Sequence, residues 1–444
     1  MFNKRKIALT LALVLTLSFA FTAGAQAEVK NVIVMIGDGL GMGQIDMARY
    51  FDQGKDGKLE LMKLPNNGIM MTSSVDGVTD SAAAGSAMAT GYKTKNGMVA
   101  MTPEGKEVDS VLDYAKDQGK ATGIISSNKV HDATPAAFAA SAKDRGMDAD
   151  LTSDIINNEV DVVLGGGGDD FSKELMNKAK EKGYDHVTTE KELANSDSEK
   201  ILGLFNESYM NYILDRDDVN SQEPTVYEMT KKAINVLSKD KDGFFLMSEG
   251  ARIDHAAHAA DVPGVVAETL DFDKAVKYAV DWAKENGDTL VVVVADHETM
   301  GFSVTEPIDK KGLKSIEVSP EYMASKMIKN DNGKGFLIGS IQDVFKEYAG
   351  VELTKEEAKE FNQSALQDDG SLKYGYLIGW EIGSVIAKKH NVGVLSSDIR
   401  AKSSTGGHTL NSVPIFAYGE ESEEFNDVIQ NTEFAEILFK ALGK

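Results

Sequence analysis

Short apolar runs alternate along the chain with longer amphipathic segments. The short runs have the length of strands, and several are apolar on both faces, as in a sheet that is covered on both sides. They span residues 32–36, 69–73, 121–126, 160–164, 244–248, 290–295 and 413–418. Helical spacing marks the segments 110–118, 225–238, 268–284 and 432–442. The alternation predicts an α/β fold with a doubly wound, largely parallel central sheet and helices on both faces.

The alternation stops between about residues 302 and 404. This stretch is polar, and its patterns at 334–348, 354–361 and 376–390 predict helices. Since a strand pattern resumes at 413, we expect one large domain over 28–444 with a helix-rich insertion at about 302–404. The glycines at 165–168 are not directly followed by a helix pattern, so a structural turn is favoured over a phosphate-binding loop.

Residues 1–27 have the composition of a secretory signal peptide. Basic residues at 4–6 precede an uncharged apolar run over 7–21, and Ala-Gln-Ala at 25–27 is a small-residue cleavage site. The run is shorter than the ~20 residues of a membrane-spanning helix, so cleavage before Glu28 is favoured over a stable membrane anchor. We expect a secreted protein, periplasmic or extracellular. The absence of Cys excludes disulfides and a lipid-anchored Cys.

The chain is strongly acidic. Its formal net charge of −23 becomes −26 once the three basic residues of the predicted signal peptide are removed, because that segment has no acidic residue. Repulsion of phosphate backbones argues against a nucleic-acid partner. An anionic substrate would need a local source of positive charge, and bound cations are candidates for it.

Metal-capable side chains follow three of the predicted strands. They are Asp38, Glu249 and the pair Asp296 and His297. Ligands of open α/β sheets gather beyond the carboxyl ends of the strands. One such residue would be an ordinary turn or helix cap, but three strand ends of this kind predict a shared site.

Asp254 and His258 are four residues apart, which places both on one face of a helical turn. Two ligands in this arrangement can hold one ion, although a solvated helix face is the alternative. His408 stands alone in a predicted loop, where a surface residue is the usual interpretation. No role is assigned to His131, His186 or His390.

Ser81 begins an alanine-rich segment that ends at Gly91, a pattern typical of a helix with a glycine stop. Asp80 and Ser81 would both serve as its N-cap. The same position suits a nucleophile, because a helix N-terminus stabilises an alkoxide or a bound phosphate. The residues alone leave both interpretations open. Neither G-x-S-x-G, Walker A nor H-E-x-x-H is present.

Six segments resemble, in the same order, the signature blocks of alkaline phosphatases. They are Val-Met-Ile-Gly-Asp-Gly-Leu-Gly-Met (34–42), Thr-Asp-Ser-Ala-Ala-Ala-Gly (79–85), Asp-Ala-Thr-Pro-Ala-Ala (132–137), Glu-Gly-Ala-Arg-Ile-Asp (249–254) with His258, Ala-Asp-His (295–297) and Gly-His-Thr (407–409). Six blocks in family order are far more specific than any single motif.

The resemblance implies a homodimeric phosphomonoesterase with two zinc ions and one magnesium. The implied ligands are Asp254, His258 and His408 for the first zinc, Asp38, Asp296 and His297 for the second, and Asp38, Thr134 and Glu249 for the magnesium. Imidazole and carboxylate suit zinc, and an oxygen-only set suits magnesium. Ser81 would be the nucleophile that becomes phosphoserine, and Arg145 would bind the phosphate through its planar donors.

His255 departs from the pattern of well-known bacterial members, which have Lys directly after the zinc-ligand Asp. Asp132 is the carboxylate that such a Lys would pair with, and Asp80 directly precedes the nucleophile. These three residues are candidates for supporting roles. A protonated His255 could bind phosphate through water, or the ring could approach the third metal.

Two alternatives to a phosphomonoesterase are open. One is a phosphodiesterase or sulfatase of the same superfamily, although Arg145 with a complete third-metal set favours the dianion of a monoester. The other is a secreted metal- or phosphate-binding protein without turnover. A nucleophile beside a full ligand set weighs against this second alternative.

Overall fold

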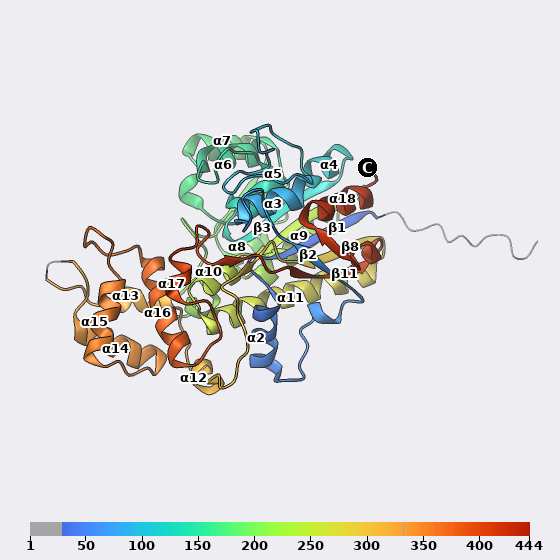
Figure 1. Cartoon of the computed structure of the whole chain (residues 1–444). Helices are drawn as coiled ribbons and strands as arrows, with labels where there is room; N and C mark the ends of the chain where they lie inside the picture. Colours follow the sequence, from blue (N-terminus) through green and yellow to red (C-terminus); the bar gives the residue numbers. More distant parts are fainter. Residues whose placement is uncertain (1–28, 332) are drawn as a thin grey trace, which may run out of the picture.

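A ten-stranded sheet forms the centre of the molecule (Figure 1). The computed structural model describes residues 29–331 and 333–444, so the predicted signal peptide lies outside the described residues. From edge to edge the strand order is β12-β2-β11-β8-β1-β7-β3-β4-β6-β5. The strands of this sheet are β1 Asn31–Gly37, β2 Asn66–Met71, β3 Ala121–Lys129, β4 Val162–Gly166, β5 Asp185–Val187, β6 Ile201–Leu204, β7 Phe244–Gly250, β8 Thr289–Val294, β11 Val413–Gly419 and β12 Val428–Gln430.

The sheet is parallel except at one strand. β11 runs antiparallel to both of its neighbours, β2 and β8. In the central strands β1, β7 and β8 every residue is buried, because helices cover both faces of the sheet. The predicted α/β fold with a doubly wound, largely parallel sheet is confirmed.

Helices cover the two faces of the sheet in separate groups (Figure 1). One group is α3 Ser81–Thr90, α4 Val111–Asp117, α5 Ala133–Ala139 and α18 Asn431–Ala441, and the other includes α9 Val226–Leu237 and α11 Val262–Asn286. Capping boxes at Ser110 and Thr225 fix the starts of α4 and α9. The remaining helices of the main body are α2 Met42–Gln53, α6 Asp148–Asn157, α7 Lys173–Glu181, α8 Glu190–Asn195 and α10 Arg252–His258.

A separate group of helices, in addition to those that cover the two faces, lies to one side of the sheet (Figure 1). It consists of α12 Lys310–Lys314, α13 Pro320–Lys326, α14 Ile338–Ala349, α15 Lys355–Ser364, α16 Gly375–Lys389 and α17 Ser397–Arg400, between the short paired strands β9 Glu298–Thr299 and β10 His408–Thr409. Their buried apolar side chains form a cluster of their own, which also includes Met47 and Phe51 of α2. Within the described ranges, no helix combines the length and apolarity needed to span a membrane.

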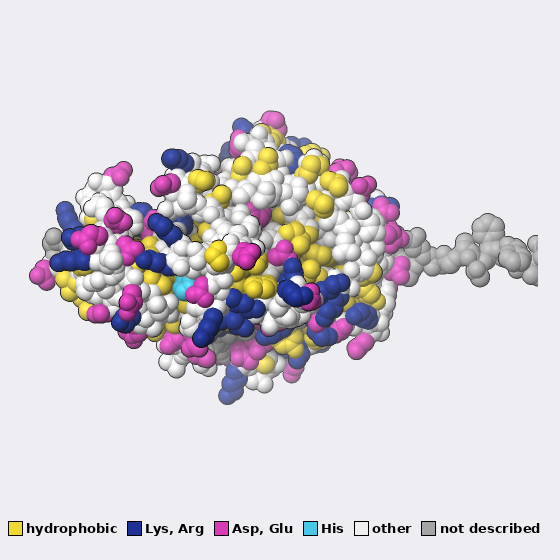
Figure 2. Space-filling model, turned by 60° about the horizontal axis from the view of Figure 1, so that its bottom comes forward, with side chains coloured by type: hydrophobic (Ala, Val, Ile, Leu, Met, Phe, Trp, Pro, Cys, Tyr) yellow, Lys and Arg dark blue, Asp and Glu magenta, His cyan; other side chains and the backbone are white. Residues whose placement is uncertain are grey.

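Charged side chains cover the surface, and on the face in Figure 2 acidic and basic groups are interspersed. A few carboxyl groups are buried instead. Asp261 is 4% exposed, and its Oδ2 has no hydrogen-bond partner. Burial raises the pKa of Asp261 to about 8. The folded protein therefore keeps a proton on Asp261 that an unfolded chain releases near pH ~4.

Asp261→Asn should stabilise the protein most at alkaline pH. Because the folded pKa lies above the unfolded one, wild-type stability falls as pH rises between about 4 and 8. The amide has no proton to lose, so the variant should gain up to ~1.4 kcal/mol per pH unit over this range. Free energies of unfolding in urea at several pH values measure the difference. The control is Asp56→Asn, which makes the same exchange of carboxylate for amide at an exposed site. A gain at Asp261 that does not change with pH would contradict the prediction.

Candidate active site

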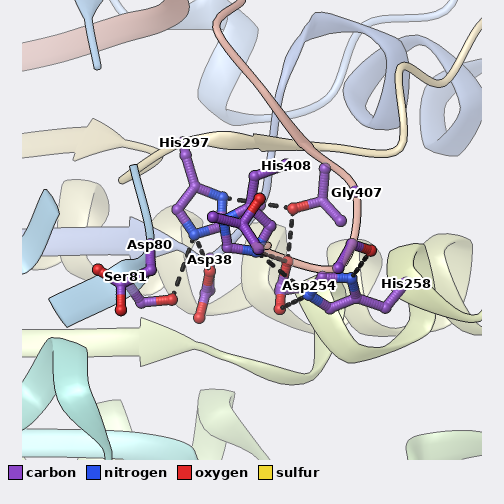
Figure 3. A network of polar contacts seen from close by, with 12 residues as sticks. Asp38, Asp80, Ser81, Asp254, His258, His297, Gly407 and His408 are labelled. Carbon is purple, nitrogen blue, oxygen red and sulfur yellow. Dashed lines mark hydrogen bonds and ion pairs between the residues drawn. The ribbon is translucent and has the colours of Figure 1, made fainter. Parts of the chain in front are cut away.

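The predicted metal ligands meet beyond the carboxyl ends of β1, β7 and β8, which are neighbours in the sheet. Asp38 follows β1, Glu249 lies near the end of β7, and Asp296 and His297 follow β8. His408 reaches them because β10 pairs with β9, which follows His297 directly. All of these side chains are buried. The structure thus brings residues from both ends of the described chain into one site (Figure 3).

Asp254, His258 and His408 form the first ligand set (Figure 3). The Nε2 atom of His258 lies 3.1 Å from Asp254 Oδ2 and 3.2 Å from Nε2 of His408. Each imidazole faces a backbone carbonyl through Nδ1, His258 that of Gly406 at 2.8 Å and His408 that of Thr79 at 2.9 Å. These carbonyls orient both rings through Nδ1 and leave the two Nε2 atoms turned to the same space as the Asp254 carboxylate. Two imidazole nitrogens and a carboxylate oxygen that converge in this way fit a metal ion.

Asp38, Asp296 and His297 form the second set. His297 Nε2 lies 3.4 Å from Asp38 Oδ1 and 3.2 Å from Asp296 Oδ2. Both carboxylate oxygens are buried without a hydrogen-bond partner. The hydroxyl of Thr299 donates to Asp254, which leaves its oxygen to accept from His297 Nδ1 at 3.3 Å. His297 therefore also directs an Nε2 lone pair at two unsatisfied oxygens, which again fits a cation.

The electrostatics of the site support this conclusion. Burial and then neighbouring carboxylates raise the pKa of Asp38 well above its ordinary value, and burial raises the pKa of Glu249 strongly and that of Asp296 to about 6. Burial also lowers the pKa of His297 to about 4 and that of His408 to about 3. Neutral imidazoles are the form that binds metals. Bound cations would allow the crowded carboxylates to ionise.

The third predicted set contains only oxygen ligands. The Thr134 hydroxyl, in α5, is buried beside the carboxylate of Glu249, whose pKa it lowers against the larger effect of burial. Glu249 accepts a hydrogen bond from the Ser126 hydroxyl at 2.5 Å, and Asp38 interacts with it electrostatically. Hard oxygen donors of this kind suit magnesium.

Ser81 is the first residue of α3 and is 4% exposed. Its Oγ lies 3.2 Å from Nε2 of His297, beside the second ligand set (Figure 3). Asp80 is the N-cap, since its carboxylate accepts from the amide of Ala83 at 3.0 Å. The cap is therefore supplied by Asp80, and the hydroxyl of Ser81 faces the ligands.

Arg145 lies beside the same helix end. Its Nη2 is 2.9 Å from Asp132 Oδ1, its Nη1 is 3.5 Å from Asp80 Oδ2, and its side chain is 33% exposed. Burial alone would raise the pKa of Asp132, but the charge of Arg145 and the amide of Ala133 outweigh it and hold the pKa below its ordinary value. Two carboxylates thus orient the guanidinium at the edge of the site.

His255 lies next to Arg252, whose Nη1 donates to Nδ1 of His255 at 2.6 Å. Burial and the adjacent guanidinium lower the pKa of His255 to about 3. The ring is therefore neutral, and the alternative in which a protonated His255 binds phosphate does not fit this geometry. Arg252 was not identified from the sequence, since an arginine within a helix has no distinguishing pattern.

A further group of possible ligands includes His131, which has no predicted role. His131 Nε2 lies 3.2 Å from Asp170 Oδ2 and 3.5 Å from Asp148 Oδ1. The Nζ atom of Lys129 lies 2.7 Å from the same Asp170 oxygen. Since Lys129 already supplies a positive charge there, we assign no ion to this group. Of the two other histidines without a predicted role, His186 is exposed in β5, whereas His390 is 8% exposed.

Comparisons with known proteins agree with this geometry. A family model described as alkaline phosphatase matches residues 29–444. Alkaline phosphatase 4 of Bacillus subtilis is 37% identical over 432 residues, which cover 93% of this chain and 88% of the relative. The crystal structure of Thermus thermophilus alkaline phosphatase aligns with a TM-score of 0.81 and 26% identity, over 96% of this chain and 95% of that one. A variant of the alkaline phosphatase TAB5, with Mg bound in its M3 site, aligns with a TM-score of 0.66 and 28% identity, over 94% of this chain and 99% of that one.

Proposed function

The chain belongs to the alkaline phosphatase family of phosphomonoesterases, and we propose that it hydrolyses phosphate monoesters to an alcohol and inorganic phosphate through a phosphoserine at Ser81. One observation carries the proposal. The Ser81 hydroxyl stands at a helix N-terminus, 3.2 Å from the ligand His297 and beside two ligand sets. Such a position favours a serine alkoxide and the phosphate it acquires.

Trapping the covalent intermediate tests this function. The enzyme would be mixed with an aryl phosphate, quenched in acid within milliseconds and digested for mass spectrometry. We expect phosphate on Ser81 and a burst of released alcohol that equals the enzyme concentration. Turnover without phosphate on Ser81 would overturn the proposed intermediate. Binding of substrate without release of alcohol would indicate a binding protein.

Three sets of residues have the chemistry to hold the metal ions that this reaction would need. We propose that Asp254, His258 and His408 hold one zinc ion, that Asp38, Asp296 and His297 hold a second, and that Asp38, Thr134 and Glu249 hold magnesium. The neutral imidazoles of His297 and His408, the unsatisfied carboxylate oxygens and the Thr134 hydroxyl beside Glu249 support this assignment. Bound ions of this kind lower the pKa of a nearby hydroxyl and stabilise charge on the entering and leaving oxygens.

The protein's own groups perform the remaining steps. The Ser81 hydroxyl loses its proton and its oxygen attacks phosphorus in line; the bond to the alcohol oxygen breaks, and this oxygen takes up a proton from solvent as the alcohol leaves. Water then attacks the phosphoserine, the bond from phosphorus to Ser81 Oγ breaks, and a proton of the water returns to Oγ as inorganic phosphate is released. Arg145 would hold two phosphate oxygens throughout, since the guanidinium is a planar pair of donors oriented by Asp80 and Asp132. The N-terminus of α3 stabilises the negative charge.

The organisation of the whole protein is part of the proposal. We propose that residues 1–27 are removed as a signal peptide on secretion, that 302–404 form an inserted subdomain of the 28–444 domain, and that two chains form a homodimer. The sequence pattern supports the first two statements, and the family resemblance supports the dimer.

His255→Lys should strengthen product inhibition at alkaline pH. The wild-type ring is neutral, whereas lysine keeps its charge near pH ~9 and would attract phosphate. We expect the inhibition constant for phosphate to fall roughly 2- to 5-fold, the effect of one screened charge, and kcat to fall with it if product release limits turnover. His255→Gln is the control, because the amide is a neutral acceptor for Arg252. Superimposable phosphate inhibition in all three proteins would show that position 255 has no part in the site.

A further inference from the structure

A cavity of about 490 Å³ opens over Ser81 and is larger than a phosphate group requires. Its lining includes the polar side chains of Ser81, Arg145 and His258. It also includes three aromatic side chains, those of Tyr209, Tyr376 and Trp380. Cavities of this volume bind whole small molecules. The space beyond the phosphate position is therefore available to the rest of a substrate.

Helix α16 supplies a continuous aromatic surface that starts at a ligand of the first set. The indole of Trp380 stacks on the imidazole of His258, with ring centroids 4.8 Å apart and an angle of 18°. Tyr376 is one helical turn earlier and contacts Trp380 edge to face, at 5.8 Å and 76°. Tyr376 is 46% exposed, so the surface extends from His258 to the cavity mouth.

This aromatic surface is held rigidly. Gly383 of α16 packs directly on the end of α10, where an added Cβ would lie 1.7 Å from the carbonyl oxygen of Ala259. Arg400 donates to the backbone carbonyls of His258 at 3.0 Å and Trp380 at 3.2 Å. A rigid surface loses little conformational entropy when it binds a ligand.

Tyr209 is the third aromatic side chain that lines the cavity. It is 43% exposed and packs edge to face on His255, with the centroids 5.3 Å apart. Single exposed aromatic residues are ordinary. Three aromatic rings that line one cavity offer apolar faces and quadrupoles that suit a flat ring.

We propose that Tyr209, Tyr376 and Trp380 form a subsite for the alcohol portion of the ester, and that this subsite binds a planar aromatic ring such as the base of a nucleoside monophosphate. The inference rests on the proposed function, in which Ser81 and Arg145 hold the phosphate, so the alcohol portion of the ester occupies the rest of the same cavity. Trp380 stacks on His258, so an alcohol portion beside His258 lies against the aromatic surface. An aliphatic phosphate ester would leave these rings without a stacking partner.

A matched pair of substrates tests the subsite. Adenosine 5′-monophosphate and ribose 5-phosphate both release a primary alcohol at the ribose 5′ oxygen, and the adenine ring is the principal difference between them. Stacking of one base on aromatic side chains should favour the nucleotide by about 10-fold in kcat/KM, mainly through KM. In Tyr376→Ala this ratio should fall towards one, whereas Tyr376→Phe, which keeps the ring, should retain it.

The outcomes separate this inference from the function on which it rests. Hydrolysis of neither compound would overturn the proposed function itself. Equal kcat/KM for both in the wild type would overturn the aromatic subsite and leave the phosphatase activity standing. A ratio that Tyr376→Ala and Tyr209→Ala both leave unchanged, with normal melting temperatures, would also overturn it. Loss of the ratio in Tyr376→Phe would assign the effect to the hydroxyl and contradict stacking.

Discussion

Ser81→Ala should reduce kcat by at least roughly 10³-fold, because removal of a covalent nucleophile costs this much or more in enzymes that use one. The zinc content should stay at the wild-type value, since Ser81 contacts His297 without belonging to either proposed zinc set. Initial rates on an aryl phosphate, together with metal analysis of the same preparation, measure both quantities.

Ser86→Ala is the matched control for this variant. Ser86 is in the same helix and is fully buried, but its hydroxyl bonds the backbone oxygens of Ala82 and Met98 and lies outside the ligand sets. We expect lower stability and normal activity per folded molecule. Equal turnover by Ser81→Ala and the wild type would end the assignment of Ser81 as nucleophile.

Removal of the metals should lower the melting temperature by at least about 10 °C and abolish activity. An ion at 1,000 times its dissociation constant stabilises a folded protein by about 4 kcal/mol, and several sites act together here. Without ions the site contains buried carboxylate oxygens of Asp38 and Asp296 that lack a hydrogen-bond partner. The absence of Cys means that no disulfide limits unfolding of the apo-protein.

Calorimetry before and after exhaustive dialysis against a chelator measures this effect, with metal loss confirmed by elemental analysis. Zinc and magnesium together should restore both the melting temperature and the activity. Asp296→Asn is a useful comparison, because it removes one carboxylate from the second set and should bind less zinc. A melting temperature that does not change on metal loss would contradict the proposed coupling of metal binding to stability.

The sheet could be predicted wherever burial on both faces leaves a continuous apolar run. That condition holds for the central strands β1, β7 and β8, so the positions predicted for them from the sequence agree closely with the structure. Three short strands were missed: β5 and β12 have three residues each and are partly exposed, and β6 is buried but has only four residues, too few for a recognisable apolar run. Helix α11 begins at Val262, six residues before the predicted start, because Pro263 is tolerated in a first helical turn.

Site residues at the ends of central strands could be identified from position alone. His408 could not, because its place depends on the pairing of β10 with β9 across more than a hundred residues. The aromatic surface was hidden for the same reason. The helix that carries Tyr376 and Trp380 was expected, but the sequence does not indicate that Gly383 docks it onto Ala259 beside His258. Long-range packing determines where these residues lie relative to the site, and local sequence patterns contain no information about such packing.

The order in which the chain supplies its ligands has a consequence for assembly. Asp38 follows the first strand, and His408 comes from β10, so the first set lacks a ligand until residues up to about 409 have emerged and paired with β9. A nascent chain can therefore offer the second set before it can offer the first. Metal uptake at the first set would then report that nearly the whole polypeptide has been synthesised and folded, and a chain cut short before β10 would lack a complete first set.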